Sequence, residues 1–141
     1  MLDEHFVPVR VHVKEQAGEF QTLGERYGAQ WTPTTLVLSA DGKERHRIEG
    51  FTPVEDFLAQ LSLGLGRMDL DEKRYDVAEK RFRGIVERHP ASEAAPEALY
   101  WAGVSRYKAT NDASALGETE KALRKRYPES PWMKKASVWA K

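Results

Sequence analysis

The sequence predicts two kinds of structure in one chain: an α/β part over residues 1–66 and an all-α part over residues 53–141. The two parts are expected to share a helix at 53–66. Three observations lead to this prediction. An Asp-Gly pair separates two strand-like runs in the first part. Beyond residue 66 strand signals vanish and apolar residues recur at helical spacing. A short motif in the second part then recurs after 38 residues.

The first element expected is a strand at residues 6–13. Four valines alternate with other residues there, which places them on one face of a strand: Val7, Val9, Val11 and Val13. Pro8 cannot donate to a ladder, so this strand is expected at a sheet edge or with a free N–H side.

A helix is expected next, at residues 16–28. Phe20, Leu23 and Tyr27 fall on one stripe, and Gly28 suits the position that follows a helix C-terminus.

Residues 30–51 predict a β-hairpin. Pro33 fixes its own φ and lacks an N–H, so it belongs just before a strand at 34–39. Asp41-Gly42 is expected to form a tight type I′ turn, which needs positive φ at both positions. The chain is then expected to return through residues 44–51.

A strong helix start follows at residues 52–55. Thr52 can cap, Pro53 fits the first turn and Glu55 occupies the capping-box position. The apolar stripe of this helix consists of Val54, Phe57, Leu58, Leu61 and Leu65.

The run W-T-P-T-x-L-V-L-x-x-D-G-K resembles the second half of a thioredoxin-fold domain, and the resemblance covers roughly residues 6–65. In that family the proline is cis and faces a Cys-x-x-C pair, whereas this chain has no cysteine. The resemblance implies that the backbone of Thr32 binds an extended peptide, which makes Trp31, Thr32 and Pro33 the candidate peptide-binding residues. A purely structural turn is the alternative.

The resemblance also implies that a central strand is missing between the strands at 6–13 and 34–39. Either these two strands pair directly, or the chain is a C-terminal fragment whose sheet is a three-stranded remnant. In the second case a Cys-x-x-C segment is expected upstream of Met1, and the upstream DNA would reveal it.

Residues 67–141 resemble tetratricopeptide repeats, most closely those of the periplasmic protein of the Tol–Pal system. Arg88-His89-Pro90-Ala91-Ser92 recurs as Arg126-Tyr127-Pro128-Glu129-Ser130. Helical stripes lie around this motif, and repeat hairpins of this kind present a face to partners. The candidate partner-binding residues on that face are Tyr100, Trp101, Arg106 and Tyr107.

The composition narrows the possible functions. The four histidines lack metal-ligand spacing, there is no phosphate loop, and Asp69, Asp71 and Glu72 read as the acidic first turn of a helix. We therefore expect no catalytic residues, metal or cofactor. Formal net charge is zero, so nucleic acid is not an expected partner, and no run is long enough to span a membrane. The acidic N-terminus is unlike a signal peptide and favours a cytoplasmic location.

Two functions follow from the sequence. The first is a non-catalytic protein-interaction or scaffold module that binds a protein or peptide, with a strand-exchanged homodimer as one possible assembly. The alternative is the C-terminal part of a thioredoxin-family thiol–disulfide oxidoreductase whose cysteines lie elsewhere. Without cysteine, the chain as given exchanges no disulfides by itself.

Overall fold

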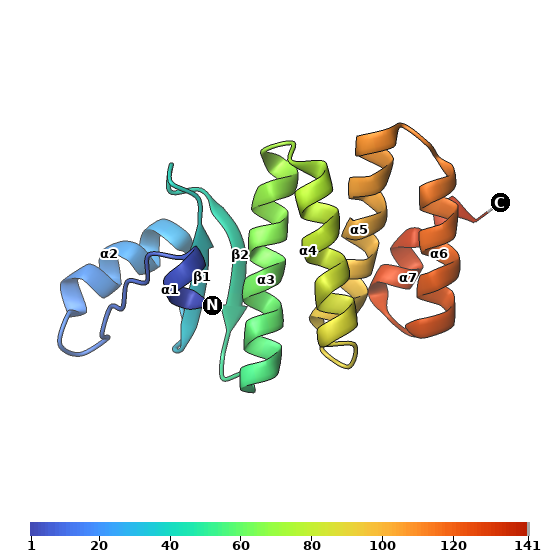
Figure 1. Cartoon of the computed structure of the whole chain (residues 1–141). Helices are drawn as coiled ribbons and strands as arrows, with labels where there is room; N and C mark the ends of the chain where they lie inside the picture. Colours follow the sequence, from blue (N-terminus) through green and yellow to red (C-terminus); the bar gives the residue numbers. More distant parts are fainter. Residues whose placement is uncertain (141) are drawn as a thin grey trace.

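The computed structural model describes residues 1–140 and arranges their elements in a row (Figure 1). A small sheet lies between α2 and α3, and helices α4 to α7 continue from α3 toward the C-terminus. None of the helices within residues 1–140 is long and apolar enough to cross a membrane. The elements are α1 Leu2–His5, α2 Ala17–Tyr27, β1 Thr34–Leu38, β2 Glu44–Glu49, α3 Val54–Asp71, α4 Tyr75–Arg88, α5 Ala94–Thr110, α6 Ser114–Arg126, α7 Pro131–Ala136 and the 3₁₀ turn η1 Ser137–Trp139.

The strand expected at residues 6–13 does not form, and the sheet has two strands rather than three. Phe6 packs against the small core at the sheet, but Val7 and Val9 are 92% and 82% exposed. The alternation of valines encodes strand propensity, yet a strand also needs a neighbour that accepts and donates ladder hydrogen bonds. Within residues 1–140 this segment has no such neighbour, so it stays unpaired. The short helix α1 was not expected from the sequence.

The predicted hairpin is present, with a different turn. β1 and β2 pair antiparallel, with Thr35 opposite Ile48 and Val37 opposite His46. Gly42 has a φ of 79°, whereas Asp41 is not at positive φ, so the turn is not type I′. The N–H of Gly42 instead donates to the carbonyl of Ser39 at 2.8 Å. The N–H of Ser39 also donates to the carbonyl of Lys43 at 3.0 Å, so residues 40–42 form a three-residue loop that ends in the left-handed Gly42.

Helix α3 begins later and ends later than predicted. Pro53 is its N-cap, no side chain caps it, and the expected capping box is therefore wrong. Glu55 reaches out of the first turn and pairs with His89 Nδ1 at 3.1 Å. Val54 is exposed and leaves the predicted stripe, while Leu61 and Leu65 are buried. The helix runs on to Asp71, so α3 contacts the sheet on one side and α4 and α5 on another.

Two glycines in the middle of α3 let its neighbours approach closely. A Cβ on Gly64 would lie 3.0 Å from the side chains of Val37 in β1 and His46 in β2. A Cβ on Gly66 would lie 2.5 Å from the Phe82 ring in α4. The sequence predicted that the helix ends at Gly66, but α3 continues past both glycines to Asp71. They allow the sheet and α4 to pack directly on the α3 backbone.

The helices beyond α3 pack as successive neighbours. Each contacts the next along the chain, and in addition α3 contacts α5 and α5 contacts α7. No comparable contact joins α4 to α6 within the described residues. The odd-numbered helices therefore lie closer together than the even-numbered ones, which makes α3, α5 and α7 one layer of this part.

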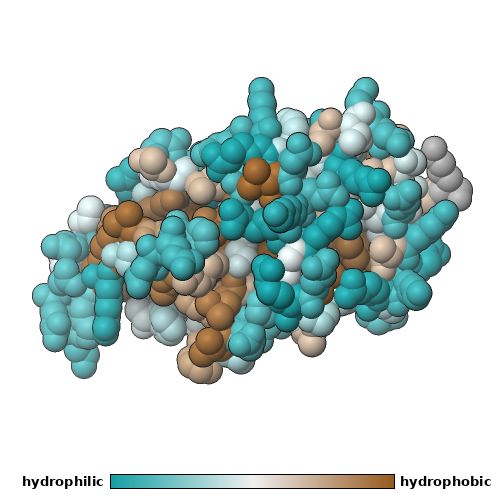
Figure 2. Space-filling model, viewed as in Figure 1, coloured by the Kyte–Doolittle hydropathy of each residue, from teal (hydrophilic) through white to brown (hydrophobic). Residues whose placement is uncertain are grey.

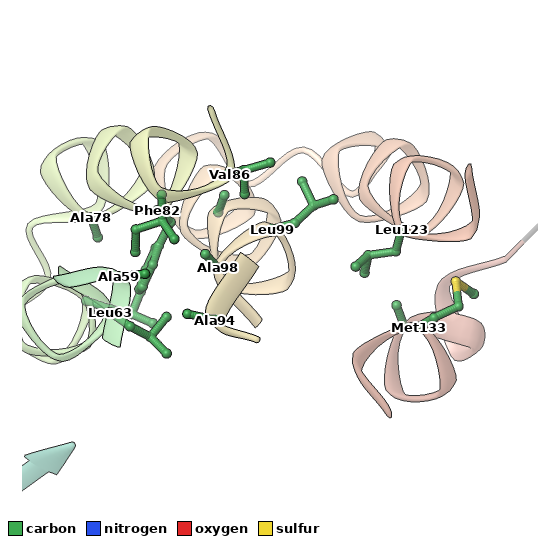
Figure 3. Close-up of a cluster of buried hydrophobic side chains, with 14 residues drawn as sticks. Ala59, Leu63, Ala78, Phe82, Val86, Ala94, Ala98, Leu99, Leu123 and Met133 are labelled. Atoms are coloured by element: carbon green, nitrogen blue, oxygen red, sulfur yellow. The ribbon is translucent and has the colours of Figure 1, made fainter. Parts of the chain in front are cut away.

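One hydrophobic core runs through all of these helices (Figure 3). Phe82 is fully buried between α3 and α5, and small alanines on α3, α4 and α5 surround it. Leu123 of α6 and Met133 of α7 close the far end. Apolar residues at helical spacing on α4 and α5 form the centre of this core, and the following are buried: Ala78, Phe82, Ile85, Val86, Ala95, Ala98, Leu99 and Ala102.

Asp69 does not lie in the acidic first turn of a helix, where the sequence placed it. It lies in the last turns of α3 and is 2% exposed. Its Oδ1 accepts a hydrogen bond from Arg74 Nε at 3.1 Å, and its Oδ2 accepts one from Arg81 Nε at 2.9 Å. A carboxylate that is buried needs such partners. Asp69 thus ties α3, the turn and α4 together.

The two copies of the recurring sequence motif contact each other in the structure. Each copy follows the end of a helix, at His89-Pro90 after α4 and at Tyr127-Pro128 after α6. The hydroxyl of Tyr127 donates to the carbonyl of Pro90 at 2.8 Å. Ser130 caps α7, accepting from the N–H groups of Trp132 and Met133, with Pro131 in the first turn.

Candidate functional site

The outer edge of β1 carries backbone groups without a partner. Gly50 N–H donates to the carbonyl of Pro33 at 2.8 Å, and hydrogen-bonded pairs alternate along an antiparallel ladder. Thr35 and Val37 therefore face β2, while the N–H and C=O groups of Thr34 and Leu36 point away from it. The sheet contains only β1 and β2, and no other described backbone group bonds to this edge. Such an edge is a template for an added strand.

The predicted Trp31-Thr32-Pro33 loop stands at the start of this edge. The Thr32–Pro33 peptide bond is cis. Thr34 Oγ1 donates to the carbonyl of Trp31 at 2.5 Å, which fixes the entry of the chain into β1. Trp31 itself is 68% exposed and does not pack into the core. Phe51, which follows the partner residue Gly50 at the same end of the hairpin, is 89% exposed.

Exposed apolar side chains gather in this half of the molecule. Among residues 1–140, ten of the twelve exposed large hydrophobic residues lie within residues 1–54: Met1, Leu2, Val7, Val9, Val13, Leu23, Trp31, Leu38, Phe51 and Val54. In Figure 2 brown surface is concentrated over the sheet and the N-terminal segment, whereas the helical part is largely teal. Apolar side chains exposed together in this way are typical of interaction surfaces.

Arg47 ties α2 to the face of the sheet that lies opposite α3. Its guanidinium donates to the carbonyl groups of Tyr27 and Gly28, the latter at 3.2 Å, and pairs with Glu44 at 2.8 Å and Glu49 at 3.1 Å. The hydrogen bond from Arg47 lowers the pKa of Glu44 below its ordinary value, and the two carboxylates raise the pKa of Arg47. No residue of α2 is buried. The helix is therefore attached by polar contacts, which leaves apolar surface uncovered.

A comparison with protein families decides the nature of this half. Residues 1–64 match the family described as a thioredoxin-like domain. Residues 1–64 are a thioredoxin-like domain. No curated protein and no solved structure matches the chain. The match ends inside α3, seven residues before the end of that helix at Asp71, so the last helix of the thioredoxin-like domain continues into the helical part.

The four candidate partner-binding residues of the helical part do not form a single cluster. Tyr100 and Trp101 of α5 belong to an aromatic cluster with Trp132 of α7 and Trp139 of η1. Arg106, farther along α5, pairs with Glu118 of α6 at 3.6 Å. Tyr107 belongs to the last turn of α5 and joins none of the aromatic pairs within residues 1–140. The structure thus brings together two of the four residues.

Sequence reasoning missed the partners of that cluster. Arg67 lies over the Trp101 ring, 4.6 Å from its centroid, and Lys135 lies over Trp132 at 4.0 Å. Arg67 and Trp101 are 34 positions apart in the sequence, and Lys135 and Trp132 lie on a short terminal helix. Hydrophobic periodicity detects neither contact. His46 of β2 is half-buried, and its Nε2 lies 2.5 Å from Gln60 Oε1 of α3.

Proposed function

We propose that this chain is a non-catalytic protein-interaction module in which a thioredoxin-like domain binds an extended peptide along the open edge of β1. The helical part is proposed to consist of tetratricopeptide-like hairpins that share α3 with the thioredoxin-like domain. The observation that carries the proposal is the pair of outward N–H and C=O groups at Thr34 and Leu36, next to the exposed Trp31. An added strand gains affinity from main-chain hydrogen bonds and specificity from neighbouring side chains.

The chemistry of the chain supports binding rather than catalysis. Thiol–disulfide exchange proceeds through a thiolate, and the sequence contains no cysteine. The thioredoxin-like domain also carries six Lys/Arg against ten Asp/Glu up to residue 66. This favours a peptide with flanking basic residues.

Substitution at Leu36 tests this proposal. We expect Leu36→Pro to weaken binding of the peptide acetyl-Lys-Thr-Val-Thr-Val-Thr-Lys-amide by about tenfold or more, because it removes an outward N–H and blocks the edge. Leu36→Ala shortens the same side chain but keeps the N–H, and should bind like the unmodified chain. Isothermal titration calorimetry measures both, and circular dichroism checks that each is folded.

Trp31→Ala gives a second test that leaves the ladder untouched, and we expect it to weaken the same peptide. Equal affinity of all four proteins, or no binding to any, would contradict the proposal.

The open edge also favours a second candidate, in which a cysteine-bearing segment adds the strand and completes an oxidoreductase of the thioredoxin family. In that case a polypeptide containing Trp-Cys-x-x-Cys after a strand should bind this chain and gain disulfide-reductase activity in the complex. Binding without such a gain favours the non-catalytic role.

A further inference from the structure

A row of cations and aromatic rings crosses the layer formed by α3, α5 and α7. Arg67 is on α3, Trp101 on α5, and Trp132 and Lys135 on α7. We call these four residues the cation–aromatic strip. The Trp101 and Trp132 rings lie 6.1 Å apart, and Tyr100 contacts both, at 5.3 and 5.1 Å between ring centroids. Trp139 stacks on Tyr100, with 4.7 Å between the ring centroids. The strip is therefore continuous from one cation to the other.

Glu97 holds one end of the strip in place. Its Oε1 accepts a hydrogen bond from Trp101 Nε1 at 3.2 Å and another from Arg67 Nη1 at 3.3 Å. This carboxylate is thereby engaged, while the remaining N–H groups of the Arg67 guanidinium stay available as donors. At the other end, the Lys135 ammonium lies over Trp132 and forms no ion pair with a residue among 1–140.

We propose that the cation–aromatic strip binds an acidic peptide segment of a partner protein, with carboxylates at Arg67 and Lys135 and an apolar side chain between them. Charge complementarity selects this occupant, since residues 67–141 carry sixteen Lys/Arg against twelve Asp/Glu. Trp, Tyr and Arg are also the side chains most often found at the centre of protein interfaces. The inference rests on the proposed role as an interaction module but uses a different surface from the β1 edge.

The arrangement of the rings argues against a nucleic acid at the same place. Single strands bind by stacking bases on open aromatic faces. In the strip, Arg67 covers a face of Trp101, Lys135 covers a face of Trp132, and Tyr100 packs against both rings. The groups presented outward are then cations, which suit carboxylates.

Intrinsic fluorescence gives a direct readout. The chain has four tryptophans, so Trp31→Phe leaves only those at 101, 132 and 139, all in the aromatic cluster. We expect the peptide acetyl-Glu-Asp-Glu-Leu-Glu-Asp-Glu-amide to change this emission in a saturable and salt-sensitive way. The same peptide with Gln and Asn in place of Glu and Asp should bind at least roughly tenfold more weakly.

Matched charge reversals locate the site. In the Trp31→Phe background, Lys135→Glu should weaken the acidic peptide by roughly tenfold, whereas Lys125→Glu on the exposed side of α6 should change affinity by less than about twofold. Lys135→Ala, which keeps the helix, should give an intermediate loss. Equal effects of Lys135→Glu and Lys125→Glu, no binding of the acidic peptide, or tighter binding of oligothymidylate would each overturn the proposal.

The two proposals fail separately. Leu36→Pro should leave binding of the acidic peptide unchanged, and Lys135→Glu should leave binding of the Thr/Val peptide unchanged. If only binding of the Thr/Val peptide is lost, the result concerns the β1 edge. If only binding of the acidic peptide is lost, the result concerns the cation–aromatic strip.

Discussion

Phe82→Ala is expected to lower the free energy of unfolding by about 3–5 kcal/mol. The Phe82 ring is 0% exposed and packs on the α3 backbone at Gly66, where a Cβ would lie 2.5 Å from it. Removing the ring leaves a cavity where α3, α4 and α5 meet, and the α3 backbone cannot collapse freely because the sheet holds its other side. Urea unfolding followed by far-ultraviolet circular dichroism measures the loss.

Two other positions calibrate this result. Val77→Ala, on the same helix but 47% exposed, should change stability by no more than about 0.5 kcal/mol. Phe57→Ala should cost about 1–2 kcal/mol, because Phe57 is half-buried against the small core at the sheet. A loss below about 1 kcal/mol for Phe82→Ala would contradict the assigned core.

Gly103→Ala is expected to destabilise the protein by about 1–3 kcal/mol, although alanine normally favours a helix over glycine. A Cβ at Gly103 in α5 would overlap Thr119 Oγ1 and lie 2.7 Å from the Thr119 Cβ in α6. Thr119 is buried and donates to the carbonyl of Ala115 at 2.7 Å, so it cannot move aside freely. Thermal unfolding measures the effect.

A double-mutant cycle and a matched glycine test the explanation. Thr119→Gly should recover part of the loss caused by Gly103→Ala, which would show as a favourable coupling energy of about 0.5 kcal/mol or more. Gly18→Ala in α2, where nothing lies within 4 Å of the added Cβ, should be neutral or stabilising by up to about 1 kcal/mol. Equal effects at the two glycines would rule out close helix packing as the cause.

Much of the fold could be predicted because its signals are local. Helical stripes, the proline before β1 and the glycine of the turn act within a few residues, and α2 and the hairpin lie where they were expected. The strand at 6–13 failed because alternation gives propensity but no partner. The capping box at Thr52 failed because α3 begins at Val54 with Pro53 as its N-cap, which moves Thr52 and Glu55 out of the two capping-box positions.

The candidate sites were predicted in part for the same reason. The Trp31-Thr32-Pro33 loop is marked by its own sequence, and the outward groups of Thr34 and Leu36 follow once the register is known. The cation–aromatic strip needs the distances between α3, α5 and α7, so periodicity found Tyr100 and Trp101 but not their cations. Arg106 shared a helix with them but pairs with α6 instead.

Amide hydrogen exchange by NMR tests the central claim most directly. In the free protein the amides of Thr34 and Leu36 should exchange much faster than those of Thr35 and Val37, which face β2. Addition of acetyl-Lys-Thr-Val-Thr-Val-Thr-Lys-amide should then protect Thr34 and Leu36 while leaving the ladder amides unchanged. Protection of all four amides in the free protein would contradict the account, because it would mean that the edge of β1 is already paired.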